Sequence, residues 1–355
     1  MVTRPGFASR YRGIRVTASS QGLRSAMGTG LALMGALGFA TSGPFSAPVL
    51  AAGMSPLQLS EMRQIVNAVV LLVLVLILRP CALRLRLARL PMLTFYGVTS
   101  YLLNQTLFFF AITRIPIGIA LLIEFTAPTW VALWVRFVRG TRLPRLTWLG
   151  MGLTLVGLVF VCELWRGLRL DAIGVLAALG SALCLTVFYL MAEQKLAEFD
   201  PLGLVAWGSI SAAVMFAVVW PVWRLPFHLL GAKGGLPQLH WPLWQLVLLI
   251  GILSTALPAV WQVSAMRFIG SATASVIGTM EVLGGAVLAW VLIGQTLTAL
   301  QVIGGIIVLA GIAVDELRPQ PREPGAVVDP NRCLIAAGLG IPNTPGQKKG
   351  SPQVG

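Results

Sequence analysis

The stretch IPIGIALLIEFTAPTWVALW, from Ile115 to Trp134, decides the fold class of this chain. As a helix it is long enough to cross the hydrocarbon of a bilayer, which takes about 20 predominantly apolar residues. One carboxylate, Glu124, stands near its middle, and Pro128 follows one turn later. Because an ionisable group in hydrocarbon is costly, Glu124 must face other protein or a watery cavity. The stretch therefore predicts a membrane helix inside a larger bundle.

The rest of the chain has the composition of a helical membrane protein. Of its 355 residues, 57% are hydrophobic and only 11% are charged, whereas a soluble domain is about one quarter charged. The formal net charge of +14 would favour a nucleic-acid partner in a soluble protein. Here arginines lie in the short connections between apolar runs, where they set membrane orientation. We therefore expect the lipid bilayer as a partner and no nucleic acid.

The apolar runs predict an all-α polytopic protein with ten transmembrane helices. Their approximate positions are 27–48, 57–79, 90–112, 116–137, 144–162, 171–192, 201–223, 241–265, 271–293 and 298–316. The first run has a second interpretation as a cleaved signal peptide, because FSAPVLAA offers small residues for cleavage. Residues 1–26 are predicted to form a basic cytoplasmic tail, and residues 317–355 a disordered cytoplasmic tail.

An internal repeat organises these helices. Setting Ala111 against Ala265 aligns the chain without a gap as far as Gly157 against Gly311. Identical pairs along this alignment include Ile115/Ile269, Ala120/Ala274, Gly140/Gly294 and Gly150/Gly304. The first span, GTGLALMGALGFA, likewise matches the sixth, GVLAALGSALCLT. The chain therefore divides into a first repeat at 27–165 and a second at 171–316, each with five helices.

An odd number of helices per repeat requires the second repeat to be inverted in the membrane, and the charges agree with this. The connection between the fourth and fifth spans carries Arg136, Arg139, Arg142 and Arg145, whereas its counterpart around IGQTLT is uncharged. The excess of Lys and Arg on one side predicts that both termini are cytoplasmic in a cell membrane. Inverted repeats of membrane helices are typical of secondary transporters, which alternate access to a site between the repeats.

Two long segments also resemble a known family. FFFAITRIPIGIALLIEFTAPTWVALW and WQVSAMRFIGSATASVIGTMEVLGGAVLAWVLIGQTLT resemble the two modules of EamA-type exporters in the drug/metabolite transporter superfamily. The resemblance implies two inverted five-helix bundles, a central cavity and export of small organic metabolites. One departure is that Glu281 precedes Val282 and not proline, so a proline break in the ninth span is not expected. Another is that the Arg of the first module comes one place later, at Arg114.

Three ionisable residues inside the spans are candidates for the transport site. Glu124 and Glu281 lie near the midplane of a bilayer core about 30 Å thick. Each is either a binding or proton-coupling carboxylate or a hydrogen-bonded group that holds helices together. Glu281 occupies the position of the family's Glu and is the preferred candidate. Arg63 either binds an anionic group, pairs with Glu61 or another carboxylate, or extends to the membrane surface.

Four further polar or amphipathic residues complete the candidate site: Asn104, Gln105, Trp261 and Gln262. They lie in the third and eighth spans, which correspond in the two repeats. Two roles remain open for them, lining the cavity or hydrogen bonding between helices.

The catalytic and cofactor motifs for which we searched are absent from the sequence. It contains no Walker A sequence, no HExxH, no aspartate cluster of the DDxxD type and no CxxC pair. We therefore expect no enzyme activity, metal site or cofactor. The leading hypothesis is an exporter of an amino acid or a similar amphipathic solute, with protons as the candidate coupling ion. The competing hypothesis is a membrane receptor or assembly scaffold that transports nothing.

Overall fold

The computed structural model describes residues 18–83, 87–115, 117–161, 171–220, 223, 225–236, 239–294 and 298–316. Its first half contains α1 (Ala18–Ala40), α2 (Ser42–Ala51), α3 (Pro56–Leu78), η1 (Pro80–Leu83), η2 (Leu87–Arg89), α4 (Leu90–Gly97), the π-helical η3 (Val98–Leu103), α5 (Asn104–Ile112), α6 (Ile117–Glu124), α7 (Ala127–Phe137) and α8 (Arg145–Val161). Its second half contains α9 (Ala172–Lys195), α10 (Pro201–Val219), η5 (Phe227–Gly231), β1 (Lys233–Leu236), β2 (Leu239–Pro242), α11 (Leu243–Gly251), the π-helical η6 (Ile252–Ala256), α12 (Leu257–Gly278), α13 (Met280–Ile293) and α14 (Ala299–Glu316).

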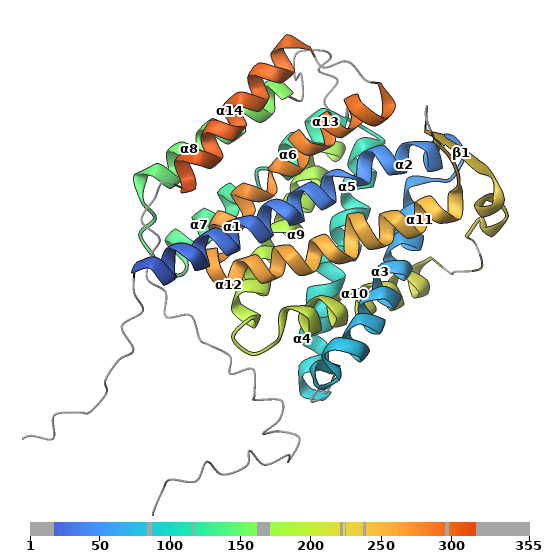
Figure 1. The fold of residues 1–355 in the computed structure, drawn as a ribbon, viewed down its shortest axis with the longest axis horizontal. Coiled ribbons are helices and arrows are strands. Elements are labelled where there is room, and N and C mark those ends of the chain that lie inside the picture. The colour runs from blue at the N-terminus through green and yellow to red at the C-terminus, as the bar shows by residue number, and fades with distance from the viewer. Residues whose placement is uncertain are drawn as a thin grey trace, which may run out of the picture.

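These helices form a polytopic membrane fold (Figure 1). In the described part of the chain, six helical stretches are long and apolar enough to cross a membrane. They are Leu23–Ala51, Pro56–Leu78, Ile119–Phe137, Ala172–Lys195, Pro201–Val219 and Leu243–Gly278. Helices α8, α13 and α14 are also apolar but shorter. Helix α1 begins at Ala18, earlier than predicted, and the tail predicted from residue 317 lies outside the described residues.

Several helices begin where the sequence supplies a cap. The hydroxyl of Ser55 accepts a hydrogen bond from the backbone N–H of Gln58, whose side chain accepts one from Ser55 N–H in return. This reciprocal pair starts α3. Asp171 caps α9 and Asp200 caps α10, with Pro201 in the first turn of α10. These caps satisfy backbone donors that have no acceptor within the helix.

The fourth predicted span is broken beside its carboxylate. Helix α6 ends at Glu124, and α7 begins only at Ala127. Pro128 has no N–H to donate to the carbonyl of Glu124, so the regular ladder stops there. The hydroxyl of Thr126 donates to Ile123 O at 2.6 Å and stabilises the turn. The break places the Glu124 carboxylate at a helix end.

The start of the ninth predicted span also contains a helix break, at a threonine turn and not at a proline, and we did not predict it from the sequence. Helix α12 ends at Gly278, and α13 begins at Met280. Between them Thr279 donates both its backbone N–H (3.1 Å) and its hydroxyl (2.7 Å) to Val276 O. Earlier in α12, Gly270 has φ of +73° and interrupts the helix. A threonine turn therefore does what proline does in the first module.

Two helix crossings repeat the same contact in the two halves of the chain. A methyl group added to Gly28 of α1 would lie 3.5 Å from Ala265 O, and one added to Gly174 of α9 would lie 3.6 Å from Ala111 O. Ala111 and Ala265 are the identical pair that begins the sequence repeat. Gly28 and Gly174 likewise correspond in the matched first and sixth spans. A helix of the first half thus packs against the second half in the same way as the corresponding helix of the second half packs against the first.

Helices α8 and α14 lie side by side at one edge of the molecule (Figure 1). A methyl group on Gly157 would lie 2.7 Å from Gly304 O, and one on Gly311 would lie 2.7 Å from Gly150 O. The repeat pairs Gly157 with Gly311 and Gly150 with Gly304, so each contact maps onto the other. Only glycine allows the two antiparallel backbones to approach this closely.

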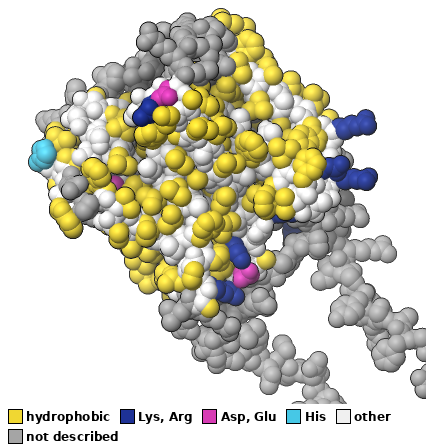
Figure 2. Space-filling view, turned by 180° about the vertical axis from the view of Figure 1, so that it is seen from behind, with side chains coloured by type: hydrophobic (Ala, Val, Ile, Leu, Met, Phe, Trp, Pro, Cys, Tyr) yellow, Lys and Arg dark blue, Asp and Glu magenta, His cyan; other side chains and the backbone are white. Residues whose placement is uncertain are grey.

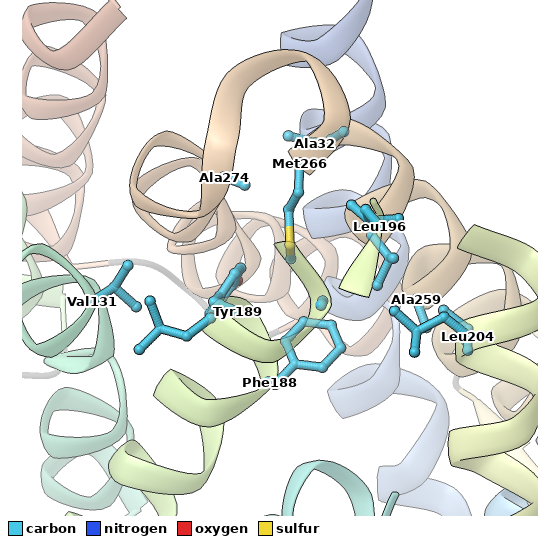
Figure 3. Close-up of a cluster of buried hydrophobic side chains, with 14 of the residues drawn as sticks. Ala32, Val131, Phe188, Tyr189, Leu196, Leu204, Ala259, Met266 and Ala274 are labelled. Carbon is cyan, nitrogen blue, oxygen red and sulfur yellow. The ribbon is translucent and has the colours of Figure 1, made fainter. Parts of the chain in front are cut away.

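The core is apolar, and so is much of the outer surface. Figure 3 shows buried side chains from several helices meeting around Phe188 and Tyr189 of α9. Figure 2 shows hydrophobic side chains over most of one face, with the visible charged side chains toward its edges. Large apolar residues such as Ile77 and Val218 are exposed. A surface of this kind suits contact with lipid and not with water.

The hairpin formed by β1 (Lys233–Leu236) and β2 (Leu239–Pro242) was not predicted, since most of it lies in the connection between the seventh and eighth predicted spans. Its strands pair antiparallel, with Lys233 opposite Pro242 and Leu236 opposite Leu239. Each strand has only four residues, and KGGL has no alternation of apolar and polar residues. Such a short segment lacks the pattern by which strands are recognised.

Candidate functional site

Glu124 is held by two polar side chains from other helices. Its Oε1 accepts hydrogen bonds from Asn104 Nδ2 at 3.2 Å and from Ser181 Oγ at 2.8 Å. Asn104 Nδ2 also donates to Ser181 O at 3.2 Å. These three residues lie at the end of α6, the start of α5 and the middle of α9. A closed polar group therefore joins three helices at the break in the fourth span.

Arg63 and Glu281 lie close enough to Glu124 to interact with it. Arg63 is half-buried on α3 and donates from Nη1 to Ser42 Oγ at 3.2 Å. Glu281 is half-buried in the first turn of α13. The three charged groups interact electrostatically with one another. The fold thus brings together two carboxylates and one guanidinium that are far apart in the sequence.

The two carboxylates differ in their partners. Glu124 accepts two hydrogen bonds from side chains, whereas no described residue donates a hydrogen bond to Glu281. A carboxylate can accept several hydrogen bonds, and a guanidinium donates several in a fixed geometry. Glu281 and Arg63 therefore keep free capacity to accept from a cation and to donate to an anion. Together they are chemically suited to a small solute that carries both charges.

Gln262 makes hydrogen bonds between helices. It is 1% exposed, and its Nε2 donates to Ala274 O at 2.8 Å and to the Tyr189 hydroxyl at 3.2 Å. That hydroxyl lies directly against Gly278 at the end of α12. These contacts connect α12 with α9 beside the second helix break, which fits the helix-linking role that the sequence left open.

The remaining predicted residues are less engaged. Trp261 and Gln105 are half-buried, and the side chains of the described residues offer neither of them a hydrogen bond. Neither is drawn into the group around Glu124. Their role as part of the lining of a site remains a prediction.

Arg63 does not pair with Glu61, one of the partners considered from the sequence. Residues two apart on a helix point in different directions. Glu61 is fully buried, and both of its carboxylate oxygens lack a hydrogen-bond partner within the described structure. Arg63 instead donates a hydrogen bond to Ser42 and interacts electrostatically with Glu281 and Glu124 on other helices.

Sequence reasoning missed Ser181 and Ser42. A signal for Ser181 existed, because it aligns with Gly35 in the matched first and sixth spans. A hydroxyl in a membrane helix at a position where the other repeat has glycine indicates a specific hydrogen bond. Ser42 had no such signal, since its contact with Arg63 depends on how α2 packs against α3.

The described residues contain no cluster of three or more His, Cys, Asp or Glu side chains able to hold a metal ion. Cys81 and Cys184 are free thiols, and Cys162 and Cys333 lie outside the described part.

A cavity of about 10 Å³ beside the first break is lined in part by Phe125, Pro128 and Val276. It has room for about one water and not for a metabolite.

Comparison with known proteins identifies relatives of this arrangement. Residues 26–162 and 172–314 each match the EamA-like transporter family. The chain is 33% identical over 244 residues to the threonine/homoserine exporter RhtA of Escherichia coli strain K12, covering 68% of this chain and 76% of the relative. The RhtA protein of Salmonella typhimurium strain LT2 is 32% identical over 241 residues, covering 67% and 75%.

Two more distant matches extend the comparison. An uncharacterized transporter of Archaeoglobus fulgidus is 25% identical over 227 residues, covering 63% of this chain and 74% of the relative. A crystal structure of a protein that is 18% identical superposes with a TM-score of 0.65, covering 82% of this chain and 98% of that one. The structural match shows a shared fold.

Proposed function

Because this chain belongs to the EamA-like transporter family, we propose that it is a secondary transporter that exports an amino acid or a similar small amphipathic solute. The observation that carries the proposal is that Glu124, Glu281 and Arg63, which come from three different helices, interact electrostatically with one another inside the bundle. Ionisable residues at this depth are rare and mark substrate or ion pathways. The names of the two RhtA relatives, threonine/homoserine exporters, point to the same class of solute.

The proposed binding mode follows from charge. A zwitterionic amino acid carries an ammonium and a carboxylate on the same carbon. Glu281, which has free hydrogen-bonding capacity, accepts from the ammonium, and Arg63 donates to the carboxylate. Glu124 is held by Asn104 and Ser181 and completes the anionic side of the site. Gln262, Trp261 and Gln105 belong to the outer lining.

The proposed architecture is ten transmembrane helices in two inverted five-helix repeats, at 27–165 and 171–316. The matched contacts of Gly28 and Gly174 support it, because contacts that exchange between repeats are expected from a pseudo-twofold axis. Such an axis permits the two repeats to exchange conformations and so to alternate access to a site between them. The arginine-rich connections support cytoplasmic termini in a cell membrane.

Counterflow in proteoliposomes tests the proposal. Vesicles that contain purified protein are loaded with unlabelled L-threonine, and uptake of trace labelled L-threonine is measured, with homoserine and other amino acids as competitors. We expect exchange by the wild type and at least a tenfold loss in Glu281→Gln. Glu198→Gln, which alters an exposed ion pair, is the matched control and should exchange normally.

The same vesicles test coupling to protons. An imposed proton gradient is expected to accelerate net movement of substrate by the wild type, and to have no such effect in Glu281→Gln. The transport proposal would be refuted if folded wild-type protein exchanged none of the amino acids tested. A receptor or scaffold would be favoured if Glu124→Gln and Glu281→Gln both left the cellular phenotype intact.

A further inference from the structure

Glu193 binds donors from two distant parts of the chain. It lies in the last turn of α9, and its carboxylate forms an ion pair with Arg139, in the connection between α7 and α8. The same carboxylate accepts from the backbone N–H of Ser271 at 2.8 Å and from its hydroxyl at 2.9 Å. The side chains of Arg139 and Glu193 are only 23% and 15% exposed. The cluster is therefore largely shielded from solvent.

Local backbone geometry aims each donor at Glu193. Gly270 adopts φ of +73°, so the helical segment restarts at Ser271 with an N–H that has no acceptor in its own helix. On the other side, Gly140 adopts φ of +70° shortly after α7 ends at Phe137, and Thr141 N–H donates to Val135 O at 3.2 Å. A left-handed glycine of this kind turns the chain sharply. Arg139 stands just before that turn.

Arg139 has no alternative partner in the described structure. Its Nη2 is buried without a hydrogen bond, so its contact with Glu193 is the interaction that compensates for burying the guanidinium. Removing one partner from such a pair leaves an uncompensated charge. Loss of the contact between Arg139 and Glu193 would therefore destabilise this conformation of the protein.

More ion pairs gather at the same end of the bundle. Of the five ion pairs between described side chains, four lie here: Arg89–Glu198, Arg139–Glu193, Lys195–Glu198 and Arg267–Asp200. Arg267 also donates to Phe199 O at 3.0 Å. The fifth, Arg114–Asp171, links the turn after α5 to the N-cap of α9 at the opposite end. One end of the bundle thus carries more of these ion pairs than the other, and Arg139–Glu193 is the least exposed of them.

Two of these four ion pairs, Arg139–Glu193 and Arg89–Glu198, cross between the two family-matched segments. Arg139 and Arg89 belong to residues 26–162, whereas Glu193, Glu198 and Ser271 belong to residues 172–314. We propose that the contacts of Glu193 with Arg139 and Ser271 form a latch that closes this end of the transport path. This inference rests on the proposed transport by alternating access. The latch must break whenever the site opens toward this end, which the charge pattern assigns to the cytoplasm.

A native thiol reports on this opening. Cys184 is a half-buried free cysteine on α9 that interacts electrostatically with Glu124. With Cys81, Cys162 and Cys333 replaced by serine, Cys184 is the only remaining thiol. A membrane-impermeant maleimide added to vesicles of either orientation then measures access to the site from each side.

We expect Glu193→Gln and Arg139→Gln to raise the rate of Cys184 alkylation from the cytoplasmic side about tenfold, with a fall from the outer side. A tenfold change in population corresponds to about 1.4 kcal/mol, less than the loss expected when a buried pair is broken. The double variant should match the single ones, because both substitutions remove one contact. Arg139→Lys keeps the charge and should retain the parental rates.

Glu198→Gln is the matched control at the same end, because its pairs with Arg89 and Lys195 are exposed and exposed pairs contribute little. Parental rates in Glu193→Gln would overturn the latch, as would an equal effect in Glu198→Gln. The thermal stability of each variant is also measured. A variant that has lost its fold would be labelled faster from both sides, and that result would count against a selective latch. Counterflow by the parent tests the transport proposal separately, since the labelling rates require no substrate.

Discussion

The crossing of α8 and α14 predicts that a single methyl group on Gly157 destabilises the protein. In Gly157→Ala the added carbon would lie 2.7 Å from both Gly304 O and Val308 N. These are backbone atoms, so neither can rotate away. Reaching the optimal separation of about 3.5 Å requires the helices to part by roughly 0.8 Å. Symmetry predicts the same for Gly311→Ala, which would meet Gly150 O at 2.7 Å.

Two opposing terms set the magnitude for Gly157→Ala. Overpacking a well-packed contact costs about 1–3 kcal/mol. Replacing glycine by alanine inside a helix contributes about 0.5–1 kcal/mol in the other direction. The clash is larger, so we expect a net loss on the order of 1–2 kcal/mol.

The assay is the free energy of unfolding in mixed micelles, measured by titration with a denaturing detergent. Gly152→Ala is the matched control on the same helix, because an added methyl there would meet nothing within 4 Å. It should be as stable as the wild type or more stable. In addition, Gly304→Ala should cost less in the Gly157→Ala background than alone, since the helices have already separated. Equal stabilities of Gly157→Ala and Gly152→Ala would refute the close crossing.

Three further predictions concern the site and its supports. Ser181→Ala removes a hydrogen bond to Glu124 and should reduce threonine counterflow about tenfold, whereas Ser275→Ala, whose hydroxyl bonds only within its own helix, should not. Gly270→Ala forces alanine into φ of +73° and ψ of 169°, a region that almost only glycine adopts, and should lower the free energy of unfolding by about 1–3 kcal/mol, as detergent titration would reveal. The hydrogen bond from Arg114 lowers the pKa of Asp171 from its ordinary 3.8, so the stability that the ionised carboxylate adds is present at neutral pH and is lost as the pH falls through the lowered value. Asp171→Asn should therefore melt below the wild type at pH 7, and the gap should close only below about pH 4; a gap that closes near pH 6 would contradict this assignment.

Much of the helix layout was predictable from local sequence. The predicted starts at 57 and 201 lie within one residue of Pro56 and Pro201, where α3 and α10 begin, whereas α1 begins at Ala18, well before the predicted 27. The repeat aligns Gly140 with Gly294, and the two glycines have nearly the same φ, +70° and +74°. The sequence alignment of the two halves therefore matches equivalent turns. The membrane class and the EamA-like family also followed from the sequence, and the comparisons confirm them.

The features that the sequence analysis missed depend on contacts that a local sequence pattern does not show. The break at Thr279 was missed because its turn depends on side-chain hydrogen bonding and not on proline. The hairpin was missed because its strands are too short to show a pattern. The pairing of Arg63 with Glu61 was considered because they are neighbours in sequence, although neighbours two apart on a helix face different directions.

By itself the sequence determined that the chain enters a membrane, that its halves repeat, and that Glu124, Glu281 and Arg63 are ionisable groups within apolar spans. Composition and periodicity suffice for this, because burying apolar surface and satisfying the backbone are local demands. Only the tertiary structure decided which of these groups meet. It gave Glu124 two side-chain partners and Glu281 none among the described residues, and it set Glu193 against Arg139 and Ser271. Such contacts depend on how helices cross, and helix crossings are set by packing between residues far apart in the chain.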